Sequence, residues 1–395
     1  MTKENLLLTF NAGSSTVKIG LFETDGQQAR RIGKGLIDFR RQPLTFHLSE
    51  GPAVFDLTLK TDAGEQLHAV VDETFGILGD HFNMAGLSAI GHRVVHGGDI
   101  FTGPALLDEN SIRDIDALTA LAPLHQPQAL RLIRAVQHLR PKLRQTASFD
   151  TAFHATQSDL VRRFALPRAL HDQGIKRYGF HGLSYAFIAG EFARRMPEAA
   201  SRKTVVAHLG SGASLCALDA GESRDCSMGF STLEGVPMAT RCGAIDPGVL
   251  LHLLGPKGRT LKNLEDMLYY HSGLLGVSGI SADTRDLLKD DRREAREAVD
   301  LFCLRIAGEI GRMASTLGGL DNLVFTAGIG EHQAEIRAEI SARLGWLGLT
   351  IDADANDRNA TVISGANSSI TVLVIPTDEE QVIADEAMSV LARET

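Results

Sequence analysis

Short apolar runs recur along the chain, each bounded by glycine, asparagine or proline, and they predict buried β-strands. The runs are rich in β-branched and aliphatic side chains, and they are too short to form a helix that packs against a core. We expect strands at Leu6–Phe10, Val17–Phe22, Val205–His208, Leu323–Thr326 and Thr371–Ile375.

Longer amphipathic segments lie between the later strands and predict helices at Leu183–Arg195, Leu261–Tyr270 and Arg292–Leu317. Strands that alternate with helices indicate an α/β architecture. The segment at 290–297 is dense in charge, which is typical of a solvated helix face.

Two segments almost half the chain apart share one plan: a strand, a turn of small residues and a second strand. They span Leu7–Leu21 and Val205–Leu218. This repeat predicts a duplicated domain, with the chance recurrence of glycine and serine turns as the alternative. No low-complexity segment or linker marks a boundary, so motifs have to place the domains.

The composition is that of an ordinary globular protein. The chain has 395 residues, 44% of them hydrophobic and 23% charged, which corresponds to two or three domains. The formal net charge is −9, so no basic excess is available for a nucleic-acid partner. If the chain handles an anion, the positive charge must be local.

No apolar run approaches the length of a membrane span, and the first residues do not resemble a signal peptide. We therefore expect no membrane partner. The cysteines Cys216, Cys226, Cys242 and Cys303 form no C-x-x-C pair. Reduced thiols in the cytoplasm are the expectation for such a chain.

Three glycine-rich segments follow apolar strands: Asn11-Ala-Gly-Ser-Ser, Gly210-Ser-Gly-Ala-Ser and Gly328-Ile-Gly-Glu. Successive backbone N–H groups in such turns form an anion site, and Lys18 follows the first of them. Together they indicate a nucleoside triphosphate, although each alone is more often a plain hairpin. The P-loop, dinucleotide and protein-kinase motifs are absent. Any ATP would therefore bind between hairpins, as in actin-like and sugar-kinase-like ATPases.

Charged and imidazole side chains complete the picture of phosphoryl transfer. Arg93 lies in an apolar stretch flanked by glycines, where it needs a carboxylate or phosphate partner, a structural ion pair being the alternative. His181 stands at the entrance of a predicted helix, Arg241 in a loop before a glycine, and Asp150 after a short apolar stretch. Phosphoryl transfer needs this kind of positioning and charge stabilisation.

In their order along the chain, these motifs resemble those of the acetate kinase family. The resemblance runs nearly end to end, from Asn11-Ala-Gly-Ser-Ser-Thr-Val-Lys to Ile375-Pro-Thr-Asp-Glu-Glu. Further matches are Gly91-His-Arg-Val-Val-His-Gly-Gly, Ala122–Pro127, Phe149–His154, Arg177–Gly182, His208–Ser214, Met228–Pro247, Ser272–Ser281 and Phe325–Glu331.

The resemblance implies an α/β fold of the duplicated actin-like ATPase (ribonuclease H-like) type, with two domains and a nucleotide cleft between them. The first domain would span residues 1–150 and be completed by a C-terminal helix at 380–395, and the second would span 151–379. The resemblance further implies a cytoplasmic homodimer.

The implied activity is reversible, Mg²⁺-dependent phosphoryl transfer between ATP and acetate, giving ADP and acetyl phosphate, with Mn²⁺ as an alternative metal. A propionate or butyrate kinase with the same mechanism is the nearest rival. An actin-like protein that uses nucleotide to switch a binding state is a rival of another class. No extra partner-binding domain is visible for it, and Arg93 and Arg241 would then lack a purpose.

The resemblance also assigns roles to individual residues. Catalysis falls to Arg93, Asp150, His181 and Arg241. The substrate would contact Arg93, Val95, Leu124, Phe180 and Thr232. The nucleotide would contact Lys18, His208, Leu209, Gly210, Ser211, Gly212, Asp283, Thr284, Arg285, Gly328, Ile329, Gly330, Glu331 and His332. Asn11 and Glu379 would hold the metal.

For Asp150, an acid/base role is common in such assignments, but the acetate nucleophile is already ionised and has no proton to lose. We therefore expect Asp150 to orient Mg²⁺ or the arginines. The chain departs from the family pattern at Ser211 (usually Asn), Thr232 (usually Pro), Ala244 (usually Asp) and His332 (usually Asn). These departures bear on turnover, nucleotide preference and acyl-chain length, and leave the choice between acetate and propionate open.

Overall fold

A computed structural model describes residues 5–13, 16–26, 28–61 and 67–393. The chain divides into two compact units. Unit 1 comprises Met1–Phe153 and Asp378–Thr395, and unit 2 comprises His154–Thr377. The sequence placed these boundaries at 150/151 and 379/380. Ser14 and Ser15 of the first predicted turn lie outside the described residues.

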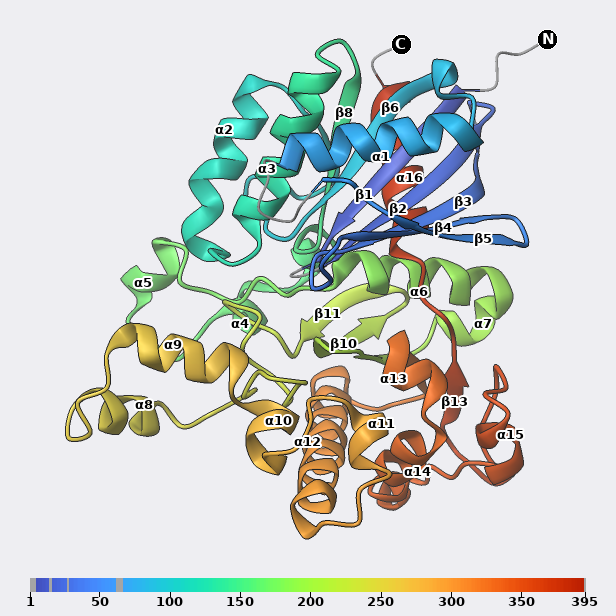
Figure 1. Ribbon diagram of the computed structural model, residues 1–395. Helices are drawn as coiled ribbons and strands as arrows, with labels where there is room; N and C mark the ends of the chain where they lie inside the picture. The colour runs from blue at the N-terminus through green and yellow to red at the C-terminus, as the bar shows by residue number, and fades with distance from the viewer. Residues whose placement is uncertain (1–4, 14–15, 27, 62–66, 394–395) are drawn as a thin grey trace. The chain divides into compact units, whose positions relative to one another are not determined.

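Unit 1 is built on a mixed sheet with the strand order β5-β4-β3-β2-β1-β6-β8-β7 (Figure 1). The first five strands form an antiparallel meander, and β6 and β8 continue the sheet parallel to β1. The bounds are β1 Asn5–Ala12, β2 Thr16–Thr24, β3 Ala29–Asp38, β4 Thr45–Glu50, β5 Ala53–Thr58, β6 Leu87–Val94, β7 Ala105–Leu106 and β8 Arg144–Phe149.

Helices cover both faces of this sheet. Leu8 and Phe10 of β1 face a core that includes residues of α1 and α3, whereas Leu7 faces α16, because successive side chains of a strand point to opposite faces. Gly91 lets α16 approach β6 closely, since a Cβ there would lie 2.7 Å from Ile383 Cγ2. The bounds are α1 Leu67–His81, η1 Met84–Gly86, α2 Glu109–Ala117, η2 Leu118–Leu121, α3 Gln126–Leu139, η3 Ala152–Thr156 and α16 Glu379–Ala392.

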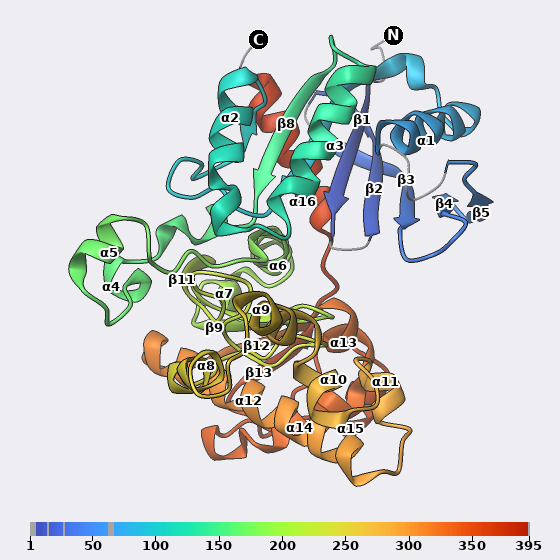
Figure 2. The same ribbon diagram turned by 60° about the vertical axis from the view of Figure 1, so that its left-hand side comes forward.

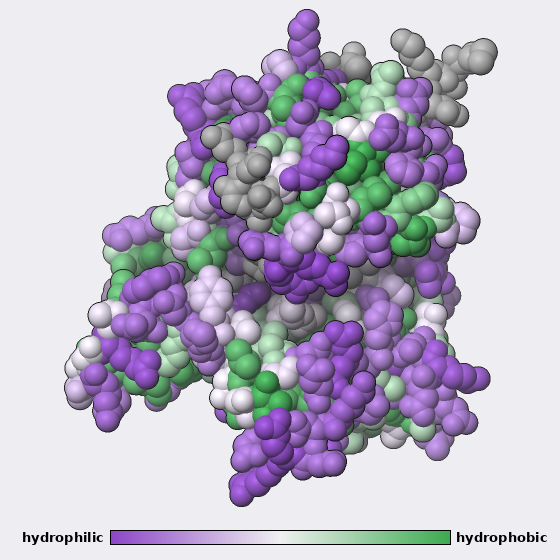
Figure 3. All heavy atoms as spheres, viewed as in Figure 1, coloured by the Kyte–Doolittle hydropathy of each residue, from purple (hydrophilic) through white to green (hydrophobic). Residues whose placement is uncertain are grey.

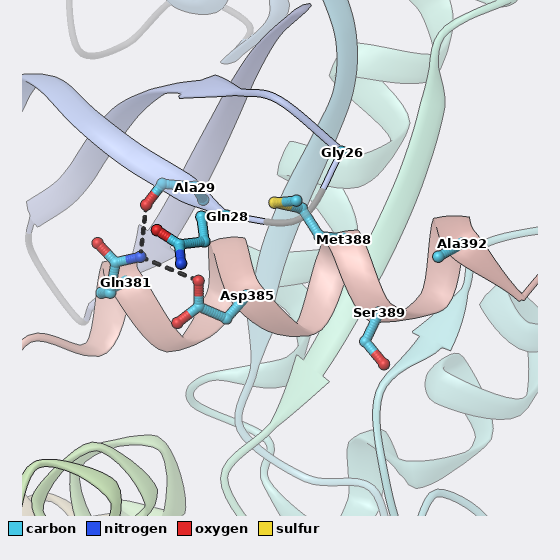
Figure 4. Close-up of a pocket in the computed structure, with 8 residues that line it drawn as sticks. All are labelled: Gly26, Gln28, Ala29, Gln381, Asp385, Met388, Ser389 and Ala392. Atoms are coloured by element: carbon cyan, nitrogen blue, oxygen red, sulfur yellow. Dashed lines mark hydrogen bonds between the residues drawn. The ribbon is translucent and has the colours of Figure 1, made fainter. Parts of the chain in front are cut away.

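Polar contacts also fasten α16 to the meander. Gln381 Nε2 donates hydrogen bonds to the Ala29 carbonyl at 2.9 Å and to Asp385 Oδ1 at 3.0 Å (Figure 4). These residues line an open pocket together with Gln28 and Met388. The last helix of the chain is therefore an integral layer of unit 1.

Unit 2 repeats the central part of unit 1. Its sheet has the order β11-β10-β9-β12-β13, in which β11, β10 and β9 form an antiparallel meander and β12 and β13 run parallel to β9. The same arrangement relates β3, β2, β1, β6 and β8. The prediction of a duplicated actin-like fold is confirmed. The bounds are β9 Thr204–Leu209, β10 Ala213–Asp219, β11 Glu222–Cys226, β12 Asn322–Thr326 and β13 Thr371–Val374.

Helices pack around this second sheet. The long helix α12 contacts β9, β10 and β11, and α6 contacts β9 (Figures 1 and 2). The bounds are α4 Asp159–Arg162, α5 Arg168–Asp172, α6 Gly182–Arg195, α7 Pro197–Ala200, α8 Pro247–Leu254, α9 Leu261–Tyr270, α10 Gly273–Ser278, α11 Thr284–Leu287, α12 Arg293–Leu317, α13 Ala327–His332, α14 Ala334–Ala342, η4 Gly345–Leu347 and α15 Ala353–Asp357.

Hydrophilic side chains cover most of the face shown in Figure 3, with apolar groups scattered between them. Within the described part of the chain, none of the helices combines the length and the apolar character that a membrane crossing requires.

Candidate active site

The unit 1 part of the site lies where two parallel strands end side by side. Arg93 is paired with Ser148 in the register of β6 and β8, and Asp150 directly follows β8. Arg93 Nε and Nη2 donate to Asp150 Oδ1 and Oδ2 at 3.0 and 2.6 Å. This bidentate geometry holds the guanidinium in one plane.

A second set of groups extends this pair. Arg93 Nη1 donates to Asn11 Oδ1 at 3.1 Å, and Asn11 Nδ2 donates to Glu379 Oε2 at 2.7 Å and to Glu380 Oε1 at 2.8 Å. Burial would lower the pKa of Arg93, but the carboxylates of Asp150, Glu379 and Glu380 outweigh it and raise that pKa above its ordinary value. Arg93 therefore stays charged at any working pH.

Lys18 stands at the edge of this network. It is the register partner of Asn11 across the β1–β2 hairpin, and its Nζ lies 4.0 Å from Glu380 Oε1. More than half of the Lys18 side chain is exposed, so its ammonium group is accessible to a ligand. Of the residues predicted for the site, unit 1 thus brings together Asn11, Lys18, Arg93, Asp150 and Glu379.

The oxygen donors of this network fit a magnesium ion. Glu379 and Glu380 supply carboxylate oxygens, which are the hard ligands that Mg²⁺ prefers, and Asn11 lies beside them. Protein sites for Mg²⁺ commonly offer one or two carboxylates and leave the remaining positions to water and substrate phosphates.

In unit 2, His181 is the N-cap of α6 and takes a left-handed backbone conformation with φ of 57°. Its Nδ1 is 2.8 Å from Ser214 Oγ, and the Tyr185 hydroxyl is 2.5 Å from the same oxygen. The imidazole is therefore held by two hydroxyl groups in series.

The ring of His181 is also stacked on that of His208, with centroids 4.3 Å apart and an interplanar angle of 19°. His208 Nδ1 is bonded to Ser184 Oγ at 2.8 Å, and Ser184 Oγ in turn lies 2.9 Å from Thr377 Oγ1. Both histidines predicted for the site thus form one stacked pair with fixed orientation.

Arg241 comes to the same place from the loop before α8. Its Nη1 donates to the Thr232 carbonyl at 2.9 Å. A Cβ on Gly212 would lie 2.9 Å from Arg241 Nη2 and 3.4 Å from His181 Nε2. The guanidinium and the imidazole therefore converge on the turn at Gly212, and glycine leaves them room there.

This turn joins β9 to β10 as predicted. Gly210 N donates to the Gly212 carbonyl at 3.2 Å, and Ala239 N donates to the Ser211 carbonyl at 3.2 Å. Leu209 is the last residue of β9 and is fully buried. The residues His208–Gly212 thus form a narrow hairpin end with His208 beneath it.

The third predicted turn is wrong in its local structure: residues 328–331 lie inside the short helix α13. Ala327 at its start has a φ of 64°, and the Ala327 N–H donates to Glu331 Oε1 at 2.8 Å. Glu331 Oε1 also accepts from Thr377 N at 3.1 Å. Arg337, fully buried on α14, donates from Nη1 to the Gly330 carbonyl at 3.0 Å.

The remaining nucleotide candidates lie on the surface of unit 2 or just beneath it. Asp283 is the N-cap of α11 and accepts from Arg285 N at 2.8 Å, while Thr284 between them is buried. Hydrogen bonds from Arg285 lower the pKa of Asp283 against the opposing effect of burial. Ile329, Glu331 and His332 lie in α13. Three quarters of the His332 side chain are exposed.

Four of the residues that were predicted to contact the substrate are divided between the two units. Val95 is buried and Leu124 is half-buried in unit 1, whereas Phe180 and Thr232 are buried in unit 2. The Phe180 carbonyl is held by His154 Nε2 at 3.0 Å. Their joint role in substrate binding stays a prediction.

Among the members of these networks that sequence reasoning missed are Glu380, Tyr185 and Ser214. All three end or extend a motif that had been singled out, since Glu380 follows Glu379, Tyr185 lies four residues after His181, and Ser214 closes the second glycine turn. The helical spacing of His181 and Tyr185 was the available signal.

The model of the Acetokinase family matches residues 6–385 of the chain. The chain belongs to this family. It is 46% identical over 396 aligned residues to the acetate kinase of Rhodopseudomonas palustris strain TIE-1, covering 96% of this chain and 97% of the relative. The predicted membership is confirmed.

Solved structures agree with this assignment. A propionate kinase from Francisella tularensis subsp. tularensis SCHU S4 superposes with a TM-score of 0.90 at 34% identity, covering 97% of this chain and 98% of the other. The acetate kinase of Porphyromonas gingivalis gives 0.88 at 33% identity, covering 98% and 100%. The chain is thus an enzyme, as predicted, and ATP-dependent phosphorylation of acetate is its activity.

Proposed function

We propose that Arg93, His181 and Arg241 carry out the transfer of the γ-phosphoryl group of ATP to a carboxylate oxygen of acetate. The new bond joins that oxygen to the γ-phosphorus, and the bond from the γ-phosphorus to the bridging oxygen of ADP breaks. The convergence of His181 Nε2 and Arg241 Nη2 on Gly212 carries the proposal.

The two arginines neutralise negative charge on the carboxylate of the substrate and on the phosphoryl group that is being transferred. The transition state spreads negative charge over the equatorial oxygens, where fixed cationic and N–H donors stabilise it. His181 donates from Nε2 to one of these oxygens. Asp150 holds the Arg93 guanidinium through both of its oxygens, so its role is to orient this arginine.

The nucleotide contacts the hairpin end His208–Gly212, whose backbone N–H groups suit phosphate oxygens. Lys18 adds an exposed ammonium group for the phosphates. The N-terminus of α11 at Asp283, Thr284 and Arg285 and the α13 segment 328–332 bind the adenosine part.

Glu379 would hold a magnesium ion, with Glu380 and Asn11 beside it. When bound, the ion would neutralise negative charge on the phosphate oxygens of ATP. Mn²⁺ is the alternative, because it accepts the same oxygen ligands. Asn11 donates from Nδ2 to both carboxylates, while its Oδ1 accepts from Arg93 Nη1.

The enzyme works as a homodimer in the cytoplasm. Helix α8 supports the dimer, because it contains Val249, Leu251 and Leu254 and none of its residues is buried within the chain. An apolar helix with no buried residue favours a partner surface. All four cysteines are free thiols, which suits a reducing compartment.

Hydroxylamine trapping of the acyl phosphate tests the proposed chemistry. Purified enzyme with ATP and Mg²⁺ is expected to form hydroxamate from acetate. Without the metal, no hydroxamate should form. Formate, propionate and butyrate are assayed in parallel, since Thr232 in the substrate stretch favours propionate as a second substrate. Folded enzyme that forms no hydroxamate from any of these acids contradicts the proposal.

A further inference from the structure

The imidazole of His181 is the end of a chain of three polar groups within unit 2. The Tyr185 hydroxyl lies 2.5 Å from Ser214 Oγ, and this oxygen lies 2.8 Å from His181 Nδ1. We infer that Tyr185 and Ser214 act as positioning residues that fix the tautomer of His181, with the proton on Nε2. This inference rests on the proposed role of His181 in phosphoryl transfer.

The relay is built from two neighbouring elements and is shielded from water. His181 and Tyr185 are four residues apart at the start of α6, so they share one face of the helix, and Tyr185 N donates to the His181 carbonyl at 3.1 Å. Ser214 on β10 stands opposite this face. Tyr185 and Ser214 are both fully buried. Buried hydroxyls of this kind keep their hydrogen bonds because no solvent replaces them.

The proton count sets the direction of the relay. A serine hydroxyl has one proton to donate and can accept from a second donor. The phenol is the more acidic hydroxyl, so Tyr185 donates to Ser214 Oγ and Ser214 donates to His181 Nδ1. A neutral imidazole that accepts at Nδ1 carries its proton on Nε2.

This tautomer is the one that phosphoryl transfer requires. Nε2 is the atom of His181 that faces Gly212, alongside Arg241 Nη2. With the opposite tautomer, Nε2 would present a lone pair to the anionic phosphoryl oxygens and repel them. The relay therefore converts His181 from an acceptor into a donor at the point where negative charge develops.

His208 allows the tautomer of His181 to change without a change in the position of its ring. His208 lies against the His181 ring at 4.3 Å and is itself held by Ser184 at 2.8 Å. These contacts keep the imidazole plane in place when the Tyr185 hydroxyl is removed. Loss of the relay should thus lower kcat and leave substrate binding largely unchanged.

The test compares Tyr185→Phe, Ser214→Ala and the double variant with a matched control, Tyr178→Phe. Tyr178 is also a buried tyrosine of unit 2, and its hydroxyl donates to the Gly174 carbonyl at 2.9 Å. We expect kcat to fall about tenfold for Tyr185→Phe, a loss typical of one hydrogen bond. The KM values for ATP and acetate should change less than twofold, and Tyr178→Phe should keep wild-type kcat.

The double variant decides between a relay and two separate contacts. In a relay, Tyr185→Phe has no further effect once Ser214→Ala has broken the chain, so the double variant should equal Ser214→Ala in kcat. Fully additive losses, or a Tyr185→Phe kcat within twofold of wild type, overturn the inference. So does a loss of kcat that Tyr178→Phe shares, because it would reflect general destabilisation.

His181→Gln separates this inference from the proposed function. If His181→Gln is inactive and Tyr185→Phe has normal activity, the relay is overturned and the proposed role of His181 stands. A fully active His181→Gln enzyme overturns the proposed role of His181, and the relay with it. Thermal melts of all variants identify any that fail to fold, and the Ser214→Ala measurement then stands on its own, with an unchanged kcat overturning the inference.

Discussion

The two arginines of the site are held by different partners. Arg93 is locked to the carboxylate of Asp150, which is almost entirely buried, whereas Arg241 donates to a backbone carbonyl of Thr232. Removing Arg93 takes the bidentate cationic partner from a buried carboxylate, while removing Arg241 takes a donor from the neutral carbonyl of Thr232. The same loss of function should therefore come with different losses of stability.

We expect Arg93→Ala and Arg241→Ala each to lower kcat/KM at least about 100-fold, or ~3 kcal/mol of transition-state stabilisation. Arg93→Ala should also lower the free energy of unfolding by about 3 kcal/mol, because the buried Asp150 carboxylate loses its bidentate ion pair. Steady-state kinetics and urea unfolding measure both effects. Lysine should restore activity only in part, since the planar fork is lost. Near-normal turnover in both alanine variants would place the site elsewhere.

We expect Thr232 to influence which acyl-chain length the substrate site accepts. Its side chain replaces the proline usual in the family, and its carbonyl, which proline would keep, binds Arg241. A pocket wall discriminates one methylene by ~1–3 kcal/mol at best. We expect kcat/KM for propionate within about tenfold of that for acetate, and a wider gap in favour of acetate in Thr232→Pro. An unchanged ratio in Thr232→Pro would mean that Val95, Leu124 and Phe180 set the pocket alone.

At the scale of elements, strand β6 contains a buried neutral histidine. His92 is fully buried, stacks on Phe10 and bonds through Nε2 to Gln145 Oε1 at 2.7 Å. Burial lowers the pKa of His92 to about 4 from 6.5, and the hydrogen bond to Gln145 opposes this only in part. The unfolded chain therefore binds a proton between these two pH values that the folded chain does not.

This difference predicts that the enzyme loses stability as the pH falls from 6.5 towards about 4. Stability must rise with pH in this window, because the unfolded state carries more protons there. The His92 contribution is on the order of 3 kcal/mol. His92→Gln, which cannot titrate, should reduce the slope in urea unfolding without abolishing it, because burial also lowers the pKa of His96 to about 4, and the exposed His252→Gln should leave the slope unchanged. A slope that His92→Gln preserves would assign the effect to other groups.

Strands and helices could be predicted from the sequence where one face of the element, or all of it, is apolar. All five strands and three helices expected from the pattern occur, because they contribute buried side chains such as Leu8, Val206 and Phe302. Strand β5 was not predictable, since none of its residues is buried and its pairing with β4 decides its conformation.

The site was predictable to the extent that its chemistry is charged. Arg93, Asp150, His181 and Arg241 stand out in sequence because such groups need partners. Ser214 and Tyr185 are neutral, and their partner comes from another element, so only the folded chain reveals their function. Helix α13, where a turn was predicted, was missed for a similar reason, because Glu331 binds Ala327 N and Thr377 N there.

At the scale of the whole molecule, the exposed apolar face of α8 predicts how copies assemble. Leu251→Glu places a charge in this face and should convert the proposed homodimer into a monomer, measured by sedimentation. Leu160→Glu is the matched control, because Leu160 is an equally exposed leucine of unit 2 on α4, with 82% of it accessible against 71% for Leu251. A dimer that survives Leu251→Glu, or one that Leu160→Glu also disrupts, would contradict the prediction.

Helix α16 gives the order in which the chain acquires its structure during synthesis. Asn11 of β1 and Glu379 of α16 are 368 positions apart, yet they are hydrogen-bonded within one unit. A ribosome has therefore produced all of unit 2 before unit 1 can cover the face that presents Leu7 and Ala89. Until then that apolar face is open, which makes the nascent chain prone to aggregation.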